Sequence, residues 1–126
     1  MHIPKPTGAE LEILKVIWDN GPSTVRLVND TLSQQRKIGY TTTLKIMQIM
    51  ADKGLLKRDT SGKTHVYMAA VSQQKTQQQL IDKLTSTAFG GSAMKLVMQA
   101  LGNKKSTKEE IDEIRAFLDH LEGGEK

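Results

Sequence analysis

The sequence lacks cysteine altogether. This absence excludes disulfides, metal sites built on thiolates and a cysteine nucleophile, and it fits a reducing cytoplasm. The sequence also lacks any run of about 18 apolar residues, the length that a membrane-spanning helix needs. The first ten residues, MHIPKPTGAE, lack the apolar core of a signal peptide. We therefore expect a cytoplasmic protein.

Features typical of enzymes are also missing. The three histidines, His2, His65 and His120, are isolated, and each is better explained as a surface residue or a partner contact than as a catalyst. The acidic clusters at 109–110 and 112–113 are best explained as favourable charges in the first turn of a helix. No Gly-rich phosphate loop occurs. We expect no enzymatic activity, no cofactor, no metal site and no small-molecule substrate.

The excess positive charge is confined to one part of the chain. Residues 1–71 carry ten Lys or Arg and six Asp or Glu, whereas residues 72–126 carry eight of each. Most of the excess lies within residues 36–65. A basic segment beside a neutral half favours a polyanionic partner. The alternative is a basic surface that is simply solvated.

Two helices are predicted at the start of the chain. Thr7 and Glu10 have the spacing of a capping box, and Asn-Gly-Pro at 20–22 ends the helix that the box begins. A second helix begins near Ser23 or Thr24. It is expected to end at about Leu32 and to bury Leu27, Val28 and Leu32.

A third helix begins in the stretch GYTTTLKIMQIMADKGL and ends before Gly54. The hydroxyl of Thr41 is expected to cap it. One face is predicted to be buried, through Thr43, Ile46, Met47 and Met50. The opposite face forms a straight polar stripe of Thr41, Lys45, Gln48 and Asp52.

A β-hairpin is predicted after the third helix. Apolar residues lie in the two flanking segments, 55–60 with Leu55 and Leu56 and 65–70 with Val66 and Tyr67, and Ser61-Gly62 supplies the chemistry of a tight turn. An isolated hairpin is only marginally stable in water, so this one must pack on the preceding helices. Three helices followed by a hairpin is the order of a winged helix-turn-helix.

In that fold the third helix enters the major groove of DNA. Its hydroxyls can bond phosphates, Lys45 and Gln48 can reach base edges, and the hairpin would follow the backbone as a wing. The residues expected to bind DNA are Thr24, Arg36, Lys37, Thr41, Thr42, Thr43, Lys45, Gln48, Lys57, Arg58, Lys63 and His65. A protein-interaction module without specific DNA binding is the alternative, although it would not need this basic bias.

Residues 72–126 are predicted to form a helical dimerisation domain that follows a winged-helix domain at 1–71. The segment breaks at Gly90-Gly91 and at Gly102-Asn103, and Ser106 and Glu109 have the spacing of a second capping box. Three short amphipathic helices are too few to close a core of their own. The apolar residues expected at the dimer interface are Leu80, Leu84, Leu96, Val97, Leu101, Ile111, Ile114, Leu118 and Leu121. Packing of these helices onto their own winged helix is the alternative.

Several stretches resemble the BlaI/MecI/CopY family of bacterial winged-helix repressors. They are ELEILKVIWDNGPSTVRLV, YTTTLKIMQIMADKGLL and GKTHVYMAAV, and FGGSAMKLVMQAL with STKEEIDEIRAFL resembles the family's dimerisation region. The resemblance implies a homodimeric repressor bound to an inverted-repeat operator. In β-lactamase systems it also implies relief of repression through cleavage caused by a membrane sensor-protease. We accordingly expect a repressor of a resistance or stress gene.

The chain departs from this family in three places. The family's resistance repressors are cut at an Asn–Phe bond, and the corresponding cleavage region here is Gln99-Ala100. The copper-responsive branch carries cysteine ligands, which this chain lacks. Ile49 stands where many relatives have a basic residue, which implies fewer phosphate contacts on that side of the third helix.

Overall fold

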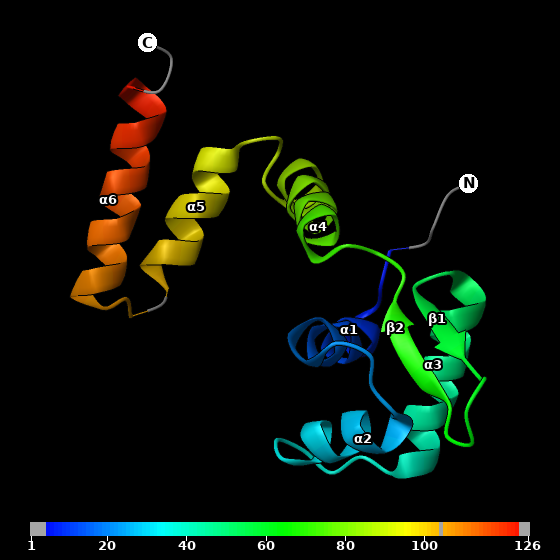
Figure 1. The fold of residues 1–126 in the computed structure, drawn as a ribbon. Coiled ribbons are helices and arrows are strands. Elements are labelled where there is room, and N and C mark those ends of the chain that lie inside the picture. The colour runs from blue at the N-terminus through cyan, green and yellow to red at the C-terminus, as the bar shows by residue number, and fades with distance from the viewer. Residues whose placement is uncertain (1–4, 104, 124–126) are drawn as a thin grey trace. The chain divides into compact units, whose positions relative to one another are not determined.

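The computed structural model describes residues 5–103 and 105–123 (Figure 1). The chain divides into two compact units, Met1–Leu80 and Ile81–Lys126. The fold is mainly α-helical with one small β-hairpin, as the sequence predicts. The elements, in chain order, are α1 (Gly8–Asn20), α2 (Val25–Ser33), α3 (Tyr40–Lys53), β1 (Leu56–Asp59), β2 (Val66–Ala69), α4 (Gln73–Ala88), α5 (Ala93–Gly102) and α6 (Lys108–Gly123).

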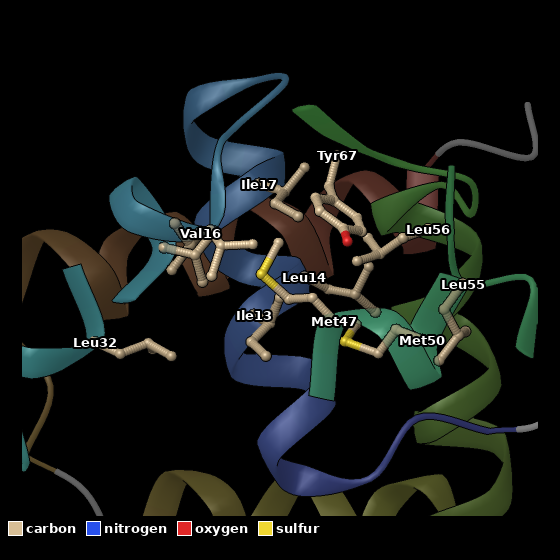
Figure 2. Close-up of a cluster of buried hydrophobic side chains, with 12 residues drawn as sticks. Ile13, Leu14, Val16, Ile17, Leu32, Met47, Met50, Leu55, Leu56 and Tyr67 are labelled. Atoms are coloured by element: carbon tan, nitrogen blue, oxygen red, sulfur yellow. The ribbon is translucent and has the colours of Figure 1, made fainter. Parts of the chain in front are cut away.

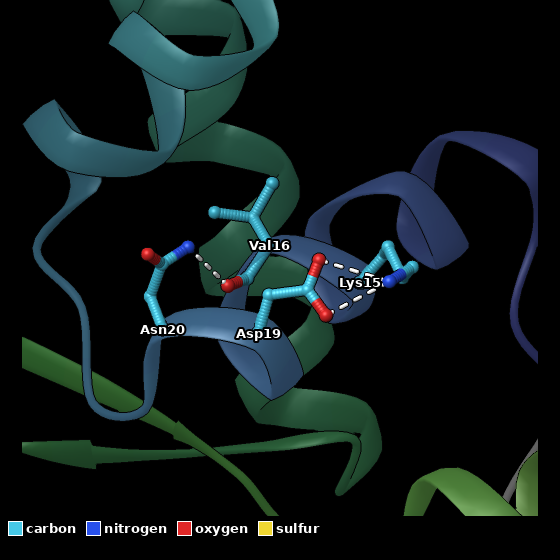
Figure 3. A network of polar contacts seen from close by, with 4 residues as sticks. All are labelled: Lys15, Val16, Asp19 and Asn20. Carbon is cyan, nitrogen blue, oxygen red and sulfur yellow. Dashed lines mark hydrogen bonds and ion pairs between the residues drawn. The ribbon is translucent and has the colours of Figure 1, made fainter.

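Local signals fix both ends of α1. The hydroxyl of Thr7 accepts from the Glu10 N–H, and the Glu10 carboxylate accepts from the Thr7 N–H, so the predicted capping box is confirmed. Gly21 ends the helix at a φ of 80°, which a residue with a side chain rarely adopts. Asn20 donates its side-chain amide to the Val16 carbonyl and so satisfies one acceptor of the last turn (Figure 3).

The second helix was predicted to begin near Ser23 or Thr24, and it begins at Val25 with Thr24 as its cap. Val25, Val28 and Leu32 are buried and lie on one face of α2. The prediction that Leu27 is buried is wrong, since its side chain is 40% exposed. Leu27 lies on the opposite face of the helix from these three residues, and an isolated exposed leucine is common on protein surfaces.

The predicted cap of α3 is also wrong. The helix starts at Tyr40, with Gly39, two residues before Thr41, at the cap position and no side-chain hydrogen bond to the cap. Thr41 therefore lies inside the first turn. The other end is as predicted, since Gly54 follows Lys53 in the left-handed conformation at a φ of 89°.

The hairpin is confirmed to within one residue at each end. β1 and β2 are antiparallel, with Leu56 opposite Ala69 and Asp59 opposite Val66. Ser23 forms a further bridge with Tyr67, in which each N–H donates to the other residue's carbonyl, at 2.9 and 2.8 Å. This bridge fixes the hairpin to the residue that precedes the cap of α2.

One hydrophobic core holds the first unit together. Its buried side chains come from α1, α2, α3 and the hairpin, and Figure 2 shows Tyr67 of β2 among residues of α1, α3 and β1. Ile13, Leu14, Met47 and Met50 are at most 1% exposed. Trp18 packs against this core, and its indole N–H donates to the Val71 carbonyl at 3.1 Å. The core thereby fixes α3 and the hairpin in one frame.

The second unit has a different character. No side chain is buried in the described residues of α5 and α6. The capping box at the start of α6 exists, but it lies one residue later than predicted. Thr107 and Glu110 form it, because the Glu110 N–H donates to the Thr107 hydroxyl and the Thr107 N–H to the Glu110 carboxylate. The sequence Ser-Thr-Lys-Glu-Glu fits either register.

Candidate nucleic-acid interface

The polar stripe of α3 is solvent-exposed along its whole length. Thr41, Lys45, Gln48 and Asp52 are all exposed, as their helical spacing predicts. Thr42 and Ile49 are exposed beside this stripe, and Ile49 retains 40% of its accessible surface. The exposed surface of α3 therefore combines hydroxyls, an amine, an amide and one apolar side chain.

Thr43 does not belong to this surface. Its side chain is 0% exposed, and its hydroxyl accepts a hydrogen bond of 2.9 Å from the Asn29 amide. The same amide donates to the Ile38 carbonyl in the loop before α3. The expectation that Thr43 contacts DNA is therefore wrong, because the hydroxyl lies in the core and bonds α3 to α2.

The predicted contacts of the hairpin all face solvent. Lys57 and Arg58 on β1, and Lys63 and His65 in and after the turn, are exposed. Asp59 shapes the turn, because its carboxylate accepts from the Ser61 hydroxyl at 2.7 Å and from the Ser61 N–H at 2.9 Å. These two bonds lower the pKa of Asp59. The acid is thus engaged within the turn, and the basic residues project around it.

An open hollow brings together the start of α2, the face of α3 and the hairpin turn. Its lining includes no acidic residue. Three of the predicted site residues outside α3, namely Thr24, Lys63 and His65, line it together with Gln48. Lys57 and Arg58 line a second hollow, beside Asp52 of α3. The structure thus places the hairpin residues beside the stripe of α3 in two separate groups.

Two residues of the first hollow were missed by the sequence analysis. Arg26 of α2 and Tyr40 of α3 both line it, and the guanidinium carbon of Arg26 lies 5.8 Å from the centre of the Tyr40 ring. This distance is within the range of a cation–π contact. The sequence indicates that each residue lies in the first turn of its helix, but it does not indicate that the two side chains contact each other.

Arg36 and Lys37 lie in the loop between α2 and α3. Both are exposed, but Arg36 is already engaged, since its guanidinium forms a 2.6 Å ion pair with Glu12 of α1. Neither residue lines the two hollows described above. The structure therefore does not bring this basic pair together with the residues of the hairpin turn.

Neither a metal-ligating cluster nor a membrane-spanning helix occurs within the described ranges 5–103 and 105–123. That part of the chain holds no group of three or more His, Asp or Glu able to bind a metal ion. In the same ranges, no helix combines the length and the apolar character needed to cross a membrane.

The apolar residues predicted at a dimer interface are accessible in the single chain. Leu80, Leu96, Ile111 and Ile114 are partly exposed. The others are 38–55% exposed, namely Leu84, Val97, Leu101, Leu118 and Leu121. Four further apolar side chains that were not predicted at the interface are also exposed, namely Ile81, Met94, Met98 and Phe117. Isolated apolar residues are common on protein surfaces, but a set of this size on short helices indicates an interaction surface.

Gln99 and Ala100 lie on α5 and are exposed. Their backbone is helical, and α5 continues to Gly102. A protease binds its substrate in an extended conformation, so cleavage between Gln99 and Ala100 would require local unfolding of α5.

Comparison with known proteins places these features in context. The penicillinase repressor family model matches residues 6–120. The penicillinase repressor of Bacillus licheniformis is 24% identical over 124 residues, which cover 98% of this chain and 97% of that protein. The transcriptional regulator BlaI of Mycobacterium tuberculosis is 26% identical over 117 residues, which cover 91% of this chain and 83% of that protein.

Two solved structures are similar in fold. One is the solution structure of the DNA-binding domain of the repressor BlaI, with a TM-score of 0.51 and 28% identity over 57% of this chain and 88% of that one. The other is the monomeric form of Bacillus licheniformis BlaI in complex with the blaP half-operator. Its TM-score is 0.51, with 27% identity over 58% of this chain and 89% of that one. The order of three helices and a hairpin is thus that of a winged-helix domain.

Proposed function

The chain belongs to the penicillinase repressor family, and from this premise we propose that it represses transcription as a homodimer bound to an inverted-repeat operator. Residues 1–71 form the DNA-binding domain, and residues 72–126 form the dimerisation domain. The protein acts in the cytoplasm, where its operator DNA is. It controls a resistance or stress gene together with a membrane sensor-protease.

The observation that carries this proposal is the hollow between α2, α3 and the hairpin turn. Its lining combines Arg26, Lys63 and His65 with Gln48 of the exposed α3 face and includes no acidic residue. A surface with basic residues and no acidic residue attracts the phosphates of DNA. It also joins the three elements that a winged helix uses on DNA, namely the recognition helix, the start of the preceding helix and the wing.

The residues divide by the part of DNA that each reaches. Lys45 and Gln48 of α3 read base edges, since an amine suits the two acceptors of guanine and an amide suits adenine. Thr41 and Thr42, in the first turn of α3, bond phosphates or meet a thymine methyl group. The remaining cations hold the backbone and so fix the register without reading sequence. This group consists of Lys37, Lys57, Arg58 and Lys63, with Thr24 and His65 as further contacts, and Arg36 once it is released from Glu12.

Dimerisation uses the exposed apolar residues of the second unit. Leu118 and Leu121 of α6 are about half exposed, and burying them against a second copy would remove this surface from water. A dimer also doubles the contacts with a palindromic operator. Two weak half-site interactions then become one tight interaction.

Relief of repression takes place at the second unit. Local unfolding of α5 exposes the Gln99–Ala100 bond to the sensor-protease system, and loss of α6 with the end of α5 abolishes the dimer. Since these two residues differ from the pair cut in the resistance repressors, a protease that acts here must accept Gln followed by Ala.

Selection of genomic fragments by the purified protein tests the proposal. We expect recovery of promoter fragments that contain an inverted repeat, and a gel shift on these fragments that survives an excess of bulk competitor DNA. The neighbouring genes would then identify the regulated pathway. A protein that shows no preference for any fragment over bulk DNA at near-cellular salt would instead support the protein-interaction module.

A further inference from the structure

We infer that Tyr40 is a positioning residue that holds Arg26 in place for a contact with one backbone phosphate of the operator. This inference rests on the proposed function and assigns a role to two residues that the sequence pattern did not indicate. Arg26 belongs to the first turn of α2, and Tyr40 is the first residue of α3. The guanidinium carbon lies 5.8 Å from the ring centre.

The contact limits the conformational freedom of an exposed arginine. Both side chains face solvent, and Tyr40 is 47% exposed. An exposed arginine would otherwise populate many rotamers, and the loss of this rotamer entropy on binding would weaken its affinity for a ligand. Stacking on an aromatic ring restricts the guanidinium and leaves the edges of its planar fork available for hydrogen bonds. The ring therefore prepares Arg26 for binding.

The surroundings indicate an anion from outside the chain as the ligand. Arg26 and Tyr40 line the hollow that also holds Thr24 and Lys63, and none of its lining residues is acidic. The guanidinium fork matches the paired oxygens of a phosphate. An anion here also lies near the start of α2, where the helix dipole favours negative charge.

The position of Arg26 favours the DNA backbone over the bases. Lys45 and Gln48 belong to α3, which enters the major groove in this fold, whereas Arg26 belongs to the helix that crosses the backbone. The bridge between Ser23 and Tyr67 fixes the start of α2 relative to the hairpin. Arg26 and Lys63 would thus hold the backbone from two elements with fixed spacing.

The test measures the affinity of the full-length protein for a selected operator and for a scrambled duplex, by fluorescence anisotropy over a range of salt concentrations. We expect Arg26→Ala to weaken binding to both duplexes by the same factor and to reduce the slope of log affinity against log salt by about one. Tyr40→Leu should weaken both by about two- to fivefold, the range of an exposed cation–π contact. Tyr40→Phe keeps the ring and should bind like the wild type.

The double variant Arg26→Ala, Tyr40→Leu separates positioning from direct contact. If Tyr40 acts through Arg26, removing the ring has no further effect once the arginine is gone. Lys15→Ala serves as the matched control, since it removes one exposed positive charge of α1 that pairs with Asp19 (Figure 3). We expect it to leave the salt slope unchanged. Thermal unfolding of each variant checks that the fold is retained.

Three outcomes would overturn the inference. A loss confined to the operator would make Arg26 a base-reading residue. An unchanged salt slope for Arg26→Ala would remove Arg26 from the interface. An equal loss for Tyr40→Leu with and without Arg26 would make Tyr40 a contact in its own right. The scrambled duplex reports on phosphate contacts even if the wild type shows no sequence preference, so this test and that of the repressor function fail separately.

Discussion

Glu10 and Lys53 join the first turn of α1 to the last turn of α3 through an ion pair of 2.7 Å. The Glu10 side chain is only 5% exposed, and the same carboxylate completes the capping box with Thr7. One buried acid thus joins the end of α3 to the start of α1. Both the stability of the fold and the orientation of α3 therefore depend on the Glu10 carboxylate.

Replacement of Glu10 should therefore reduce stability in a way that depends on pH. Burial alone would raise the pKa of Glu10, but the hydrogen bonds and the charge of Lys53, with the bonds from Thr7, lower it below 4.5. Because the folded-state pKa is the lower one, the stabilisation is fully present above about pH 4.5 and is lost as pH falls through the folded-state value. We expect Glu10→Gln to cost about 1–3 kcal/mol near neutral pH.

Urea denaturation of the wild type and the variant at a series of pH values measures this difference. The two free energies of unfolding should converge in acid. Glu12→Gln is the matched control, because Glu12 also forms an ion pair, with Arg36, but both partners are about half exposed. Exposed pairs contribute little, so this control should change stability by no more than about 0.5 kcal/mol. A constant difference between wild type and Glu10→Gln at every pH would contradict the assigned role of the charge.

Local signals were sufficient to predict most of the fold. Caps and helix-ending glycines act within a few residues, so Thr7 and Gly54 could be recognised from sequence alone, and the start of α2 could be narrowed to Ser23 or Thr24. The first capping box had one possible register. The second had two, because Ser106 and Thr107 are each followed three residues later by glutamate, and the choice between them is not encoded locally.

Within α3, the exposed residues were predictable where exposure follows from helical spacing. The stripe of α3 could be predicted because residues three and four apart share a face. Thr43 could not be separated from Thr41 and Thr42 by residue type, since its burial depends on an amide from α2. The pairing of Arg26 with Tyr40 depends in the same way on two helices that pack together after folding.

Thr41 and Thr43 of α3 provide a direct test of that difference. Thr43→Val keeps the shape of the side chain but removes the hydroxyl that Asn29 bonds, so we expect a loss of about 1 kcal/mol in stability and unchanged affinity for the operator. Thr41→Val should do the reverse, weakening operator binding while leaving stability within about 0.5 kcal/mol of the wild type. Thermal unfolding and anisotropy on the same preparations measure both. If Thr43→Val folds stably but binds the operator more weakly, Thr43 contributes to DNA binding after all.

Lys45 and Lys63 should contact different parts of the DNA, Lys45 a base edge and Lys63 a backbone phosphate. Lys45→Ala is expected to cost about 1–3 kcal/mol on the operator and to relax specificity at one base pair, because Lys45 lies on the exposed stripe of α3. Lys63→Ala should weaken all sequences alike and reduce the salt slope by about one. Affinities for the operator, for single-base variants and for a scrambled duplex separate the two. Uniform weakening by Lys45→Ala would make Lys45 a phosphate contact, and an unchanged slope for Lys63→Ala would remove the wing from the interface.

Leu118 tests whether the second unit joins two copies. The side chain is 55% exposed in the single chain, and an aspartate there would carry an unpaired charge into a dimer interface. We expect Leu118→Asp to shift the sedimentation mass from dimer to monomer and to weaken binding to the full operator by about 10²–10⁴-fold, the usual gain from joining two sites. Binding to a half-operator should not change. His120→Asp places the same acid at an exposed polar position of α6 and should remain dimeric. If Leu118→Asp sediments like the wild type, the exposed face of α6 is not where two copies meet. The high affinity for an inverted-repeat operator must then depend on another surface.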